Sequence, residues 1–408
     1  MQVRVTVGVC ALVMVPLASC AGGGDAGSGG FALRDSAGIQ IAESAAPMWK
    51  EGEGWRIAAE PSLEIGVVDG APEYQLDQVM TAWKRTDGKI VIVDRTSQTI
   101  RVFDGSGRHL RTSGGKGGGP GEFQALSWLH LLPGDSLMAY DAAVRRLSIF
   151  DPEGNLTSTR TLEFTGLSGP RAAGAFGDGT LLVISRPESG PGLPKTGVRR
   201  DSTFYLRASP DGAPLNPIVH QLGQENYIKT GDGYAVFNSL IFGRSSQYAL
   251  TSERLYAGET DRYEIGVYDP SGRLQRIIRL QRPVRPVAEE DVQTVRSRQR
   301  ATKGAPSLVR ETRKSMVEEM PVPPTMPAFA SLETDAARNL WVKEYPGAAD
   351  PDAPSRWDVF DPDGRMLGAL SMPGRFRVTQ IGSDYVLGVW KDDLDVEHVR
   401  LYPLEKPA

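Results

Sequence analysis

The chain has 408 residues, with 46 Lys and Arg against 50 Asp and Glu and a formal net charge of −4 at pH 7. This mildly acidic balance gives no reason to expect a nucleic-acid partner. Two cysteines and four histidines are too few for a disulfide framework or a recognisable zinc motif.

Residues 1–19 are predicted to be a secretory signal peptide. Arg4 precedes an apolar run over 5–16, which is shorter than the ~20 residues that a transmembrane helix needs. The run ends in Leu-Ala-Ser-Cys at 17–20, which resembles the bacterial lipobox. The resemblance implies that Cys20 becomes the first mature residue and carries the lipid that anchors the protein to a membrane. The alternative is an ordinary signal peptide with an incidental cysteine.

The lipid anchor predicts that the mature protein is located in the cell envelope. Because Ala21 follows the cysteine in place of Asp, analogy with Gram-negative sorting predicts the outer membrane. Residues 21–30 read AGGGDAGSGG and cannot bury a core, so residues 20–37 are predicted to form a flexible tether. A single large domain is expected over 38–408.

One turn signal recurs along this domain. A short β-rich run ends in an aromatic residue and is followed by Asp, often Pro, and Gly, a pattern typical of a tight turn between two strands. The copies are VFDGSG at 102–107, IFDPEG at 149–154, VYDPSG at 267–272 and VFDPDG at 359–364, with degenerate copies RASPDG at 207–212 and RLYPLE at 400–405.

The spacing of these turns predicts an all-β, six-bladed β-propeller. Measured from Asp104 to Tyr402, the successive intervals are 47, 58, 60, 92 and 41 residues, close to the length of a four-stranded blade. The last unit supplies only three strands. Its missing outer strand is predicted to come from Leu63 to Gly66, which would close the ring and leave no open edge. A β-sandwich with coincidental turns is the alternative.

Residues 88–123 resemble an NHL repeat in their strand, their VFD-x-x-G turn and their Gly-Pro-Gly-x-Phe tail. The resemblance fails after this tail, where ALSWLH at 125–130 replaces the usual continuation. The whole chain resembles the NHL-related six-bladed propeller lipoproteins of bacteria. This resemblance implies an architecture and an envelope location, and it implies no particular activity.

The 92-residue interval holds an insertion over 283–327 with two predicted helices, at 288–300 and 306–320. By strand count it joins blades 4 and 5 on the face where the innermost strands begin. A helical pair there would cap the channel, or alternatively would only pack against the blades.

The sequence contains no recognisable catalytic motif. Gly134-Asp135-Ser136-Leu137 spells a hydrolase signature, but its serine enters a strand where that chemistry requires a turn into a helix. No metal set or cofactor motif is identified.

A set of arginines in the loops between the second and third strands is the remaining candidate site. These loops are expected to share the face of the insertion, and guanidinium groups suit carboxylate or sulfate ligands. The candidates are Arg95, Arg145, Arg146, Arg199, Arg200, Arg262 and Arg356, with Lys391 in the last blade. The alternative is ordinary exposed arginine balanced by nearby aspartates.

The sequence therefore favours a binding or scaffold lipoprotein whose partner is an acidic glycan or an envelope protein. The other class considered is an enzyme at the channel mouth, such as a sugar lactonase, lyase or dehydrogenase.

Overall fold

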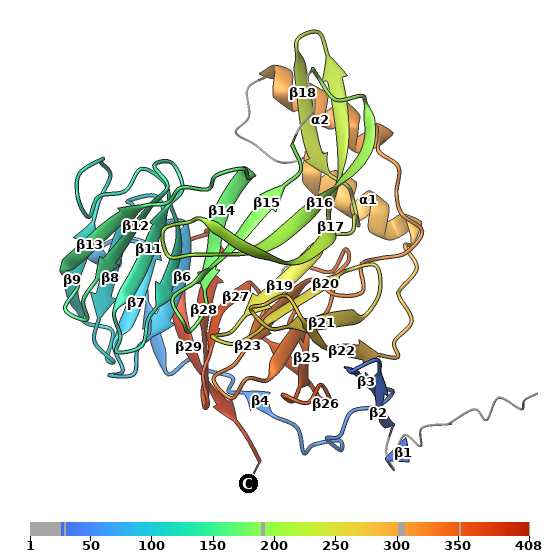
Figure 1. The fold of residues 1–408 in the computed structure, drawn as a ribbon, viewed down its shortest axis with the longest axis horizontal. Coiled ribbons are helices and arrows are strands. Elements are labelled where there is room, and N and C mark those ends of the chain that lie inside the picture. The colour runs from blue at the N-terminus through green and yellow to red at the C-terminus, as the bar shows by residue number, and fades with distance from the viewer. Residues whose placement is uncertain (1–25, 28–29, 189–191, 301–306, 351, 408) are drawn as a thin grey trace, which may run out of the picture.

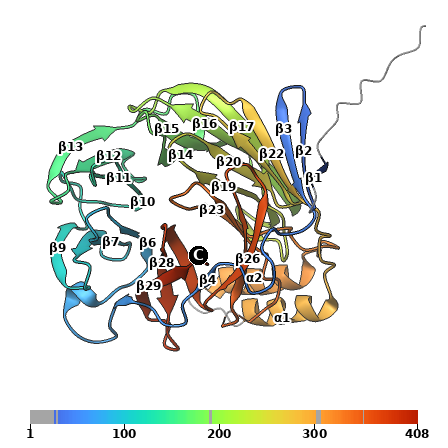
Figure 2. The same ribbon diagram turned by 90° about the horizontal axis from the view of Figure 1, so that it is seen from below.

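The computed structural model describes residues 26–27, 30–188, 192–300, 307–350 and 352–407. Within these ranges the strands form six sheets arranged as a ring (Figures 1 and 2). The innermost strands of all six sheets line a central channel. The six-bladed β-propeller predicted from the turn spacing is therefore confirmed. No helix in the described part of the chain is long and apolar enough to cross a membrane. The predicted signal peptide and Cys20 lie outside the described residues.

Blades 1 and 2 are the simplest, each with four antiparallel strands in chain order from the channel outward. They comprise β6 (Val79–Lys84), β7 (Ile90–Asp94), β8 (Thr99–Phe103) and β9 (His109–Gly114), then β10 (Leu126–Leu131), β11 (Leu137–Asp141), β12 (Arg146–Phe150) and β13 (Leu156–Thr161).

Blade 3 carries an arm. Two of its strands are much longer than their counterparts and run beyond the blade on the side of the insertion (Figure 1). Its strands are β14 (Ser168–Ala175), β15 (Leu181–Arg186), β16 (Gly197–Ala208), β17 (Pro214–Gly231) and β18 (Tyr234–Ser239).

Blades 4 and 5 flank the insertion. Blade 4 consists of β19 (Ser246–Leu250), β20 (Leu255–Glu259), β21 (Glu264–Tyr268) and β22 (Leu274–Leu280). Blade 5 consists of β23 (Ser331–Thr334), β24 (Leu340–Lys343), β25 (Ser355–Phe360) and β26 (Met366–Met372).

Blade 6 is completed by the N-terminal part of the chain. Its own strands are β27 (Phe376–Ile381), β28 (Tyr385–Lys391) and β29 (Glu397–Glu405), and β5 (Leu63–Ile65) pairs antiparallel with β29. The short strand β4 (Arg56–Ile57) pairs with the end of β29, and a 3-10 turn, η1 (Pro72–Tyr74), leads into blade 1. The predicted closure is confirmed, because Ile65 lies opposite Val399 and Leu63 opposite Leu401.

The recurring turn joins the third and fourth strands of a blade. In the four clear copies, the side chain of the Asp accepts hydrogen bonds from backbone N–H groups further along the turn. The Gly adopts a positive φ, for example 82° at Gly154 and 81° at Gly364. A side chain at these positions would be strained, which explains why the motif keeps its glycine.

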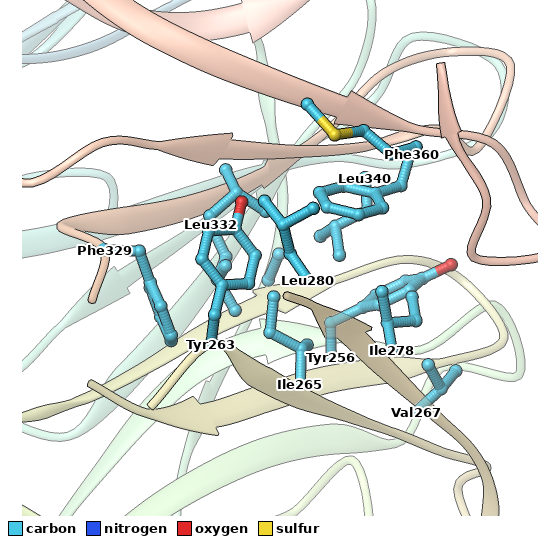
Figure 3. Close-up of a cluster of buried hydrophobic side chains, with 13 residues drawn as sticks. Tyr256, Tyr263, Ile265, Val267, Ile278, Leu280, Phe329, Leu332, Leu340 and Phe360 are labelled. Carbon is cyan, nitrogen blue, oxygen red and sulfur yellow. The ribbon is translucent and has the colours of Figure 1, made fainter. Parts of the chain in front are cut away.

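Hydrophobic clusters seal all six interfaces between neighbouring blades. The second strand of a blade contributes side chains to two of these clusters. In β7, Ile90 and Ile92 face blade 6, whereas Val91 and Val93 face blade 2. Alternate side chains of a strand point to opposite faces, so a strand buried on both faces is apolar throughout. Figure 3 shows the cluster between blades 4 and 5, where side chains of β20 to β22 meet those of β23 to β26.

The segment predicted to be a flexible tether, 20–37, is described over 26–27 and 30–37. Phe31–Ser36 forms β2, which pairs with β3 (Ile39–Ser44) as a hairpin, and β1 (Ala26–Gly27) pairs with β2. Strand β3 lies parallel to β22 and extends blade 4. Residues 31–36 are therefore strand, because the tight turn at Ala37 and Gly38, both at positive φ, lets their backbone pair with that of β3.

The insertion contains α1 (Glu289–Arg300) and α2 (Ser307–Glu319), close to the predicted helices. The apolar side chains of α2, Met316 and Val317, pack with Tyr227 on the blade 3 arm in one buried cluster. Lys229 of the arm also binds Glu319, with Nζ 2.6 Å from Oε1. The apolar face of the insertion is thus used for packing against the arm.

Candidate functional site

The predicted arginines lie on the face that carries the insertion, but their contacts differ. Arg95 and Arg145 are exposed, and no ion pair with another described residue involves either one. Arg146 instead binds the glycine-rich loop before blade 2, donating to the carbonyls of Gly118 at 3.0 Å and Glu122 at 2.5 Å. Its role in the structure is to hold this loop.

Three further candidates are held by acidic neighbours. Arg200 makes a two-pronged contact with Asp261, at 3.0 and 2.7 Å, which ties blade 3 to blade 4. Arg199 pairs with Asp201 at 2.6 Å. Arg262 is largely exposed, pairs with Glu264 at 3.1 Å and lines a separate groove that also holds Glu259 and Asp261.

Arg356 is the one of the seven that lines a basic cleft. This cleft, of about 650 Å³, lies between the insertion and blades 5 and 6. We call it the insertion cleft. The lining includes seven basic side chains and three acidic ones: Arg285, Arg298, Lys343, Arg356, Arg375, Arg377 and Lys391, against Glu344, Asp350 and Glu397. A positive lining is notable in a chain whose net charge is negative.

Two basic side chains of the cleft, Arg375 and Arg377, are fixed by the scaffold. Arg377 of β27 donates to the carbonyls of Val79 and Met80, so it bridges blades 6 and 1. Arg375 binds Asp352 through two nitrogens and donates to the carbonyl of Asp392 at 2.9 Å. These bonds orient the guanidinium groups before any ligand arrives.

Three other basic side chains of the cleft, Arg298, Arg356 and Lys391, are more exposed to solvent. Arg298 of α1 donates to the carbonyl of Ala349 at 3.0 Å. Arg356 is about half exposed, with its Nε 3.3 Å from a carboxylate oxygen of Glu344. Lys391 is similarly exposed, and its Nζ lies 3.5 Å from Glu397.

Burial acts on two cations of the cleft. It lowers the pKa of Lys343 and that of Arg377, because a low-dielectric environment disfavours the charged form. Arg375 behaves in the opposite way, since its hydrogen bonds to Asp352 raise its pKa. An anionic ligand would stabilise the charged form of Lys343 and Arg377.

Four arginines of the cleft were missed by sequence reasoning, which considered only the loops between second and third strands. Arg375 and Arg377 stand at the start of the first strand of blade 6, and Arg285 and Arg298 belong to the insertion. Both kinds of segment reach the same face of a propeller. The strand count could therefore have included them, but their convergence with Arg356 depends on how the insertion folds.

Within the described ranges, no group of three or more His, Cys, Asp or Glu side chains is arranged so that it could bind a metal ion. The expected hairpin at the hydrolase-like motif is present, with Asp135 at a φ of 61° between β10 and β11.

Ring order, closure and blade packing define this protein as a six-bladed β-propeller. Residues 76–168 match a family model, DUF5128, which is described as a 6-bladed beta-propeller. The matched region covers blades 1 and 2 and includes the segment that resembles an NHL repeat. No curated protein matches the chain.

One solved structure with a similar fold is a protein from Bacteroides fragilis NCTC 9343 that is named as an exported protein. It is 11% identical to this chain and has a TM-score of 0.47, and the match covers 90% of this chain and 100% of that protein. A DUF4221 member from Bacteroides vulgatus is 13% identical, with a TM-score of 0.45 over 87% and 99%. Virginiamycin B lyase from Staphylococcus aureus is 11% identical, with a TM-score of 0.40 over 84% and 98%. At such low identities and TM-scores, none of these similarities bears on what this protein binds.

Proposed function

We propose that this protein is a lipid-anchored, extracytoplasmic binding protein that holds an acidic glycan in the insertion cleft. The observation that supports it best is the convergence of seven basic side chains on one cleft of about 650 Å³. A cleft of this size suits a ligand of a few sugar rings. The channel-mouth enzyme considered from the sequence has no comparable support.

The acidic character of the ligand follows from the chemistry of the lining. Guanidinium groups present a rigid fork of N–H donors that matches a carboxylate or sulfate, and charge-assisted hydrogen bonds are the stronger ones. Arg375 and Arg377 are oriented by the blades, whereas Arg298, Arg356 and Lys391 lie nearer to solvent. A ligand with several negative groups would contact both sets.

Removing the three more exposed cations together should weaken binding of an acidic glycan. Each exposed contact contributes only about 0.5–1 kcal/mol, so Arg298→Ala, Arg356→Ala and Lys391→Ala combined should raise the Kd for oligogalacturonate roughly tenfold or more. Binding should also weaken as salt increases. Calorimetric titration at two salt concentrations measures both effects, and the melting temperature should stay near that of the parent.

The matched control is the double variant Arg95→Ala with Arg262→Ala, which removes two exposed cations of the same face outside the insertion cleft. It should bind as the parent does. Equal losses in the two variants would mean a diffuse electrostatic effect, and no binding by the parent at low salt would refute the proposal.

The anchor is tested at Cys20. Cys20→Ser removes the thiol that the lipobox-like run assigns to lipid attachment, so the variant should leave the membrane fraction or remain unprocessed. Fractionation of cells followed by detection of the protein measures this. A processed variant that stays in the membrane fraction would contradict lipidation, and parent protein in the inner membrane would contradict outer-membrane sorting.

A further inference from the structure

The central channel holds a second cavity, on the face away from the insertion. Its volume is about 540 Å³, and its lining comes from the innermost strands of all six blades: β6, β10, β14, β19, β23 and β27. The hairpin loops that follow β19, β23 and β27 also line it, with Ser252, Arg338 and Gly382. Those loops lie opposite the insertion, so this cavity is separate from the insertion cleft.

Most polar side chains of this cavity already bond to the protein. Gln380 accepts from the backbone N–H of Lys84 at 2.6 Å and donates to its carbonyl at 3.2 Å. Thr379 donates to the carbonyl of Ala82 at 2.9 Å. Asp335 accepts from Asn339 at 2.7 Å and from Trp341 at 3.0 Å. These bonds join neighbouring strands and leave such groups little capacity for a ligand.

Two polar side chains differ from this pattern. The side chains of His130 and Glu333 line the cavity, are partly exposed to it, and make no hydrogen bond or ion pair with another described residue. Their polar atoms are therefore free to bind a ligand in the channel.

The open groups lie on opposite walls of the channel. His130 belongs to blade 2 and Glu333 to blade 5, which are three blades apart in a ring of six and therefore face each other. Figure 2 shows the ring from the side opposite the insertion. A ligand in the channel would lie between the imidazole and the carboxyl group.

Aromatic rings fix the imidazole. Trp128 stacks on His130 with 5.7 Å between ring centroids and 16° between planes, and Trp83 meets it edge-on at 6.2 Å. Burial lowers the pKa of His130, so the ring is neutral at pH 7, with one nitrogen to donate and one to accept. Burial also raises the pKa of Glu333 to about 7, with Arg377 opposing the shift. The carboxyl can then accept or donate.

The charge around the cavity argues for a neutral ligand. At its mouth Arg338 is paired with Glu253 at 2.9 Å, and Lys84 lies 4.5 Å from the centre of the Tyr385 ring. An anion would face the Glu333 carboxyl group, and a cation would pass Lys84, whereas the Arg338–Glu253 pair adds no net charge. A hydroxyl-rich ring supplies both donors and acceptors, and its C–H groups can contact the indoles.

We propose that the central channel, entered from the face opposite the insertion, binds a neutral saccharide between His130 on blade 2 and Glu333 on blade 5. This site goes beyond the proposed function, since it lies in another cavity and selects another class of sugar. A channel of about 540 Å³ accommodates one or two rings.

The test uses the full-length processed protein in a detergent without a sugar headgroup, because glycoside detergents would compete. Cellobiose, maltose and N,N′-diacetylchitobiose are titrated by calorimetry up to about 10 mM. We expect saturable binding of at least one. Glu333→Leu should weaken it at least about tenfold, and Glu333→Gln, which keeps a hydrogen-bonding group, should weaken it less.

His130→Phe provides an independent variant that keeps an aromatic ring and removes both nitrogens, and it too should lose about tenfold. Glu333→Leu should not lower the melting temperature, because burial already disfavours the charge that it removes. Arg356→Ala, in the insertion cleft, should leave disaccharide binding unchanged and so separates the two sites.

Binding of none of the three sugars would overturn the proposal. Equal binding by the parent, Glu333→Leu and His130→Phe would do the same, and so would digalacturonate binding that depends on Glu333.

Discussion

Deleting residues 1–67 is expected to abolish cooperative unfolding of the propeller. The deletion removes β5, whose residues Leu63 to Ile65 pair with β29, and so exposes one edge of blade 6. It also removes Ile65, which is 2% exposed and belongs to the cluster between blades 6 and 1. Loss of such a side chain alone costs about 2–5 kcal/mol, and the open edge adds to that cost. Thermal unfolding followed by circular dichroism measures the change.

Deletion of residues 1–45 is the matched control. It removes the hairpin of β2 and β3 from blade 4 but keeps β4 and β5 in place. This variant should melt at a lower temperature, because Ala42 and Ser44 are buried, and it should still melt cooperatively. If both deletions melt alike, ring closure through β5 does not stabilise the fold.

The ring could be predicted because its signals are local. Each turn needs a carboxylate that caps nearby N–H groups and a residue that adopts a positive φ, as at Asp361 and Gly364. Asp and Gly meet these needs, so the turns can be recognised from the sequence. Runs such as Ile90–Asp94 are apolar because they face two blades at once. Four clear turns and two degenerate copies, the last of them in a three-stranded unit, were enough to predict closure.

The attachments to the ring were not predictable in the same way. The hairpin of β2 and β3 joins β22 as a parallel neighbour some 230 residues away in the chain, for example at Ala42 and Ile278. No motif in the sequence indicates that β3 pairs with β22. The long arm of blade 3 was also missed, because its lengthening lies within strands whose ends the sequence does not mark.

Side-chain partners were the least predictable feature of the candidate site. Of the arginines expected in loops, Arg146 lies in β12 and Arg199 and Arg200 lie in β16, and whether each is free depends on contacts between blades. Arg200 is held by Asp261 from the next blade, whereas Arg356 reaches the insertion cleft. Arg298 and Arg375 join it only because the insertion lies beside blades 5 and 6.

A second large effect is expected at Asp358, a completely buried carboxylate in β25. Arg282, which directly precedes the insertion, donates to both of its oxygens at 2.8 and 2.9 Å, and the hydroxyl of Tyr263 donates at 2.9 Å. Removing one partner of a buried ion pair leaves a charge without compensation. Arg282→Met should therefore lower the free energy of unfolding by about 3–5 kcal/mol, measured by denaturant titration.

Arg356→Ala gives the matched comparison, because Arg356 also approaches Asp358, at 3.6 Å, but is half exposed. An exposed ion pair contributes about 0–1 kcal/mol, so this variant should be nearly as stable as the parent. Arg282→Met combined with Asp358→Leu should recover much of the loss, since removing both charges also removes the cost of burying an unpaired one. If Arg282→Met alone is as stable as Arg356→Ala, the buried contact does not anchor the insertion to blade 5, and the cleft between them must be held by the packing of α2 against the arm.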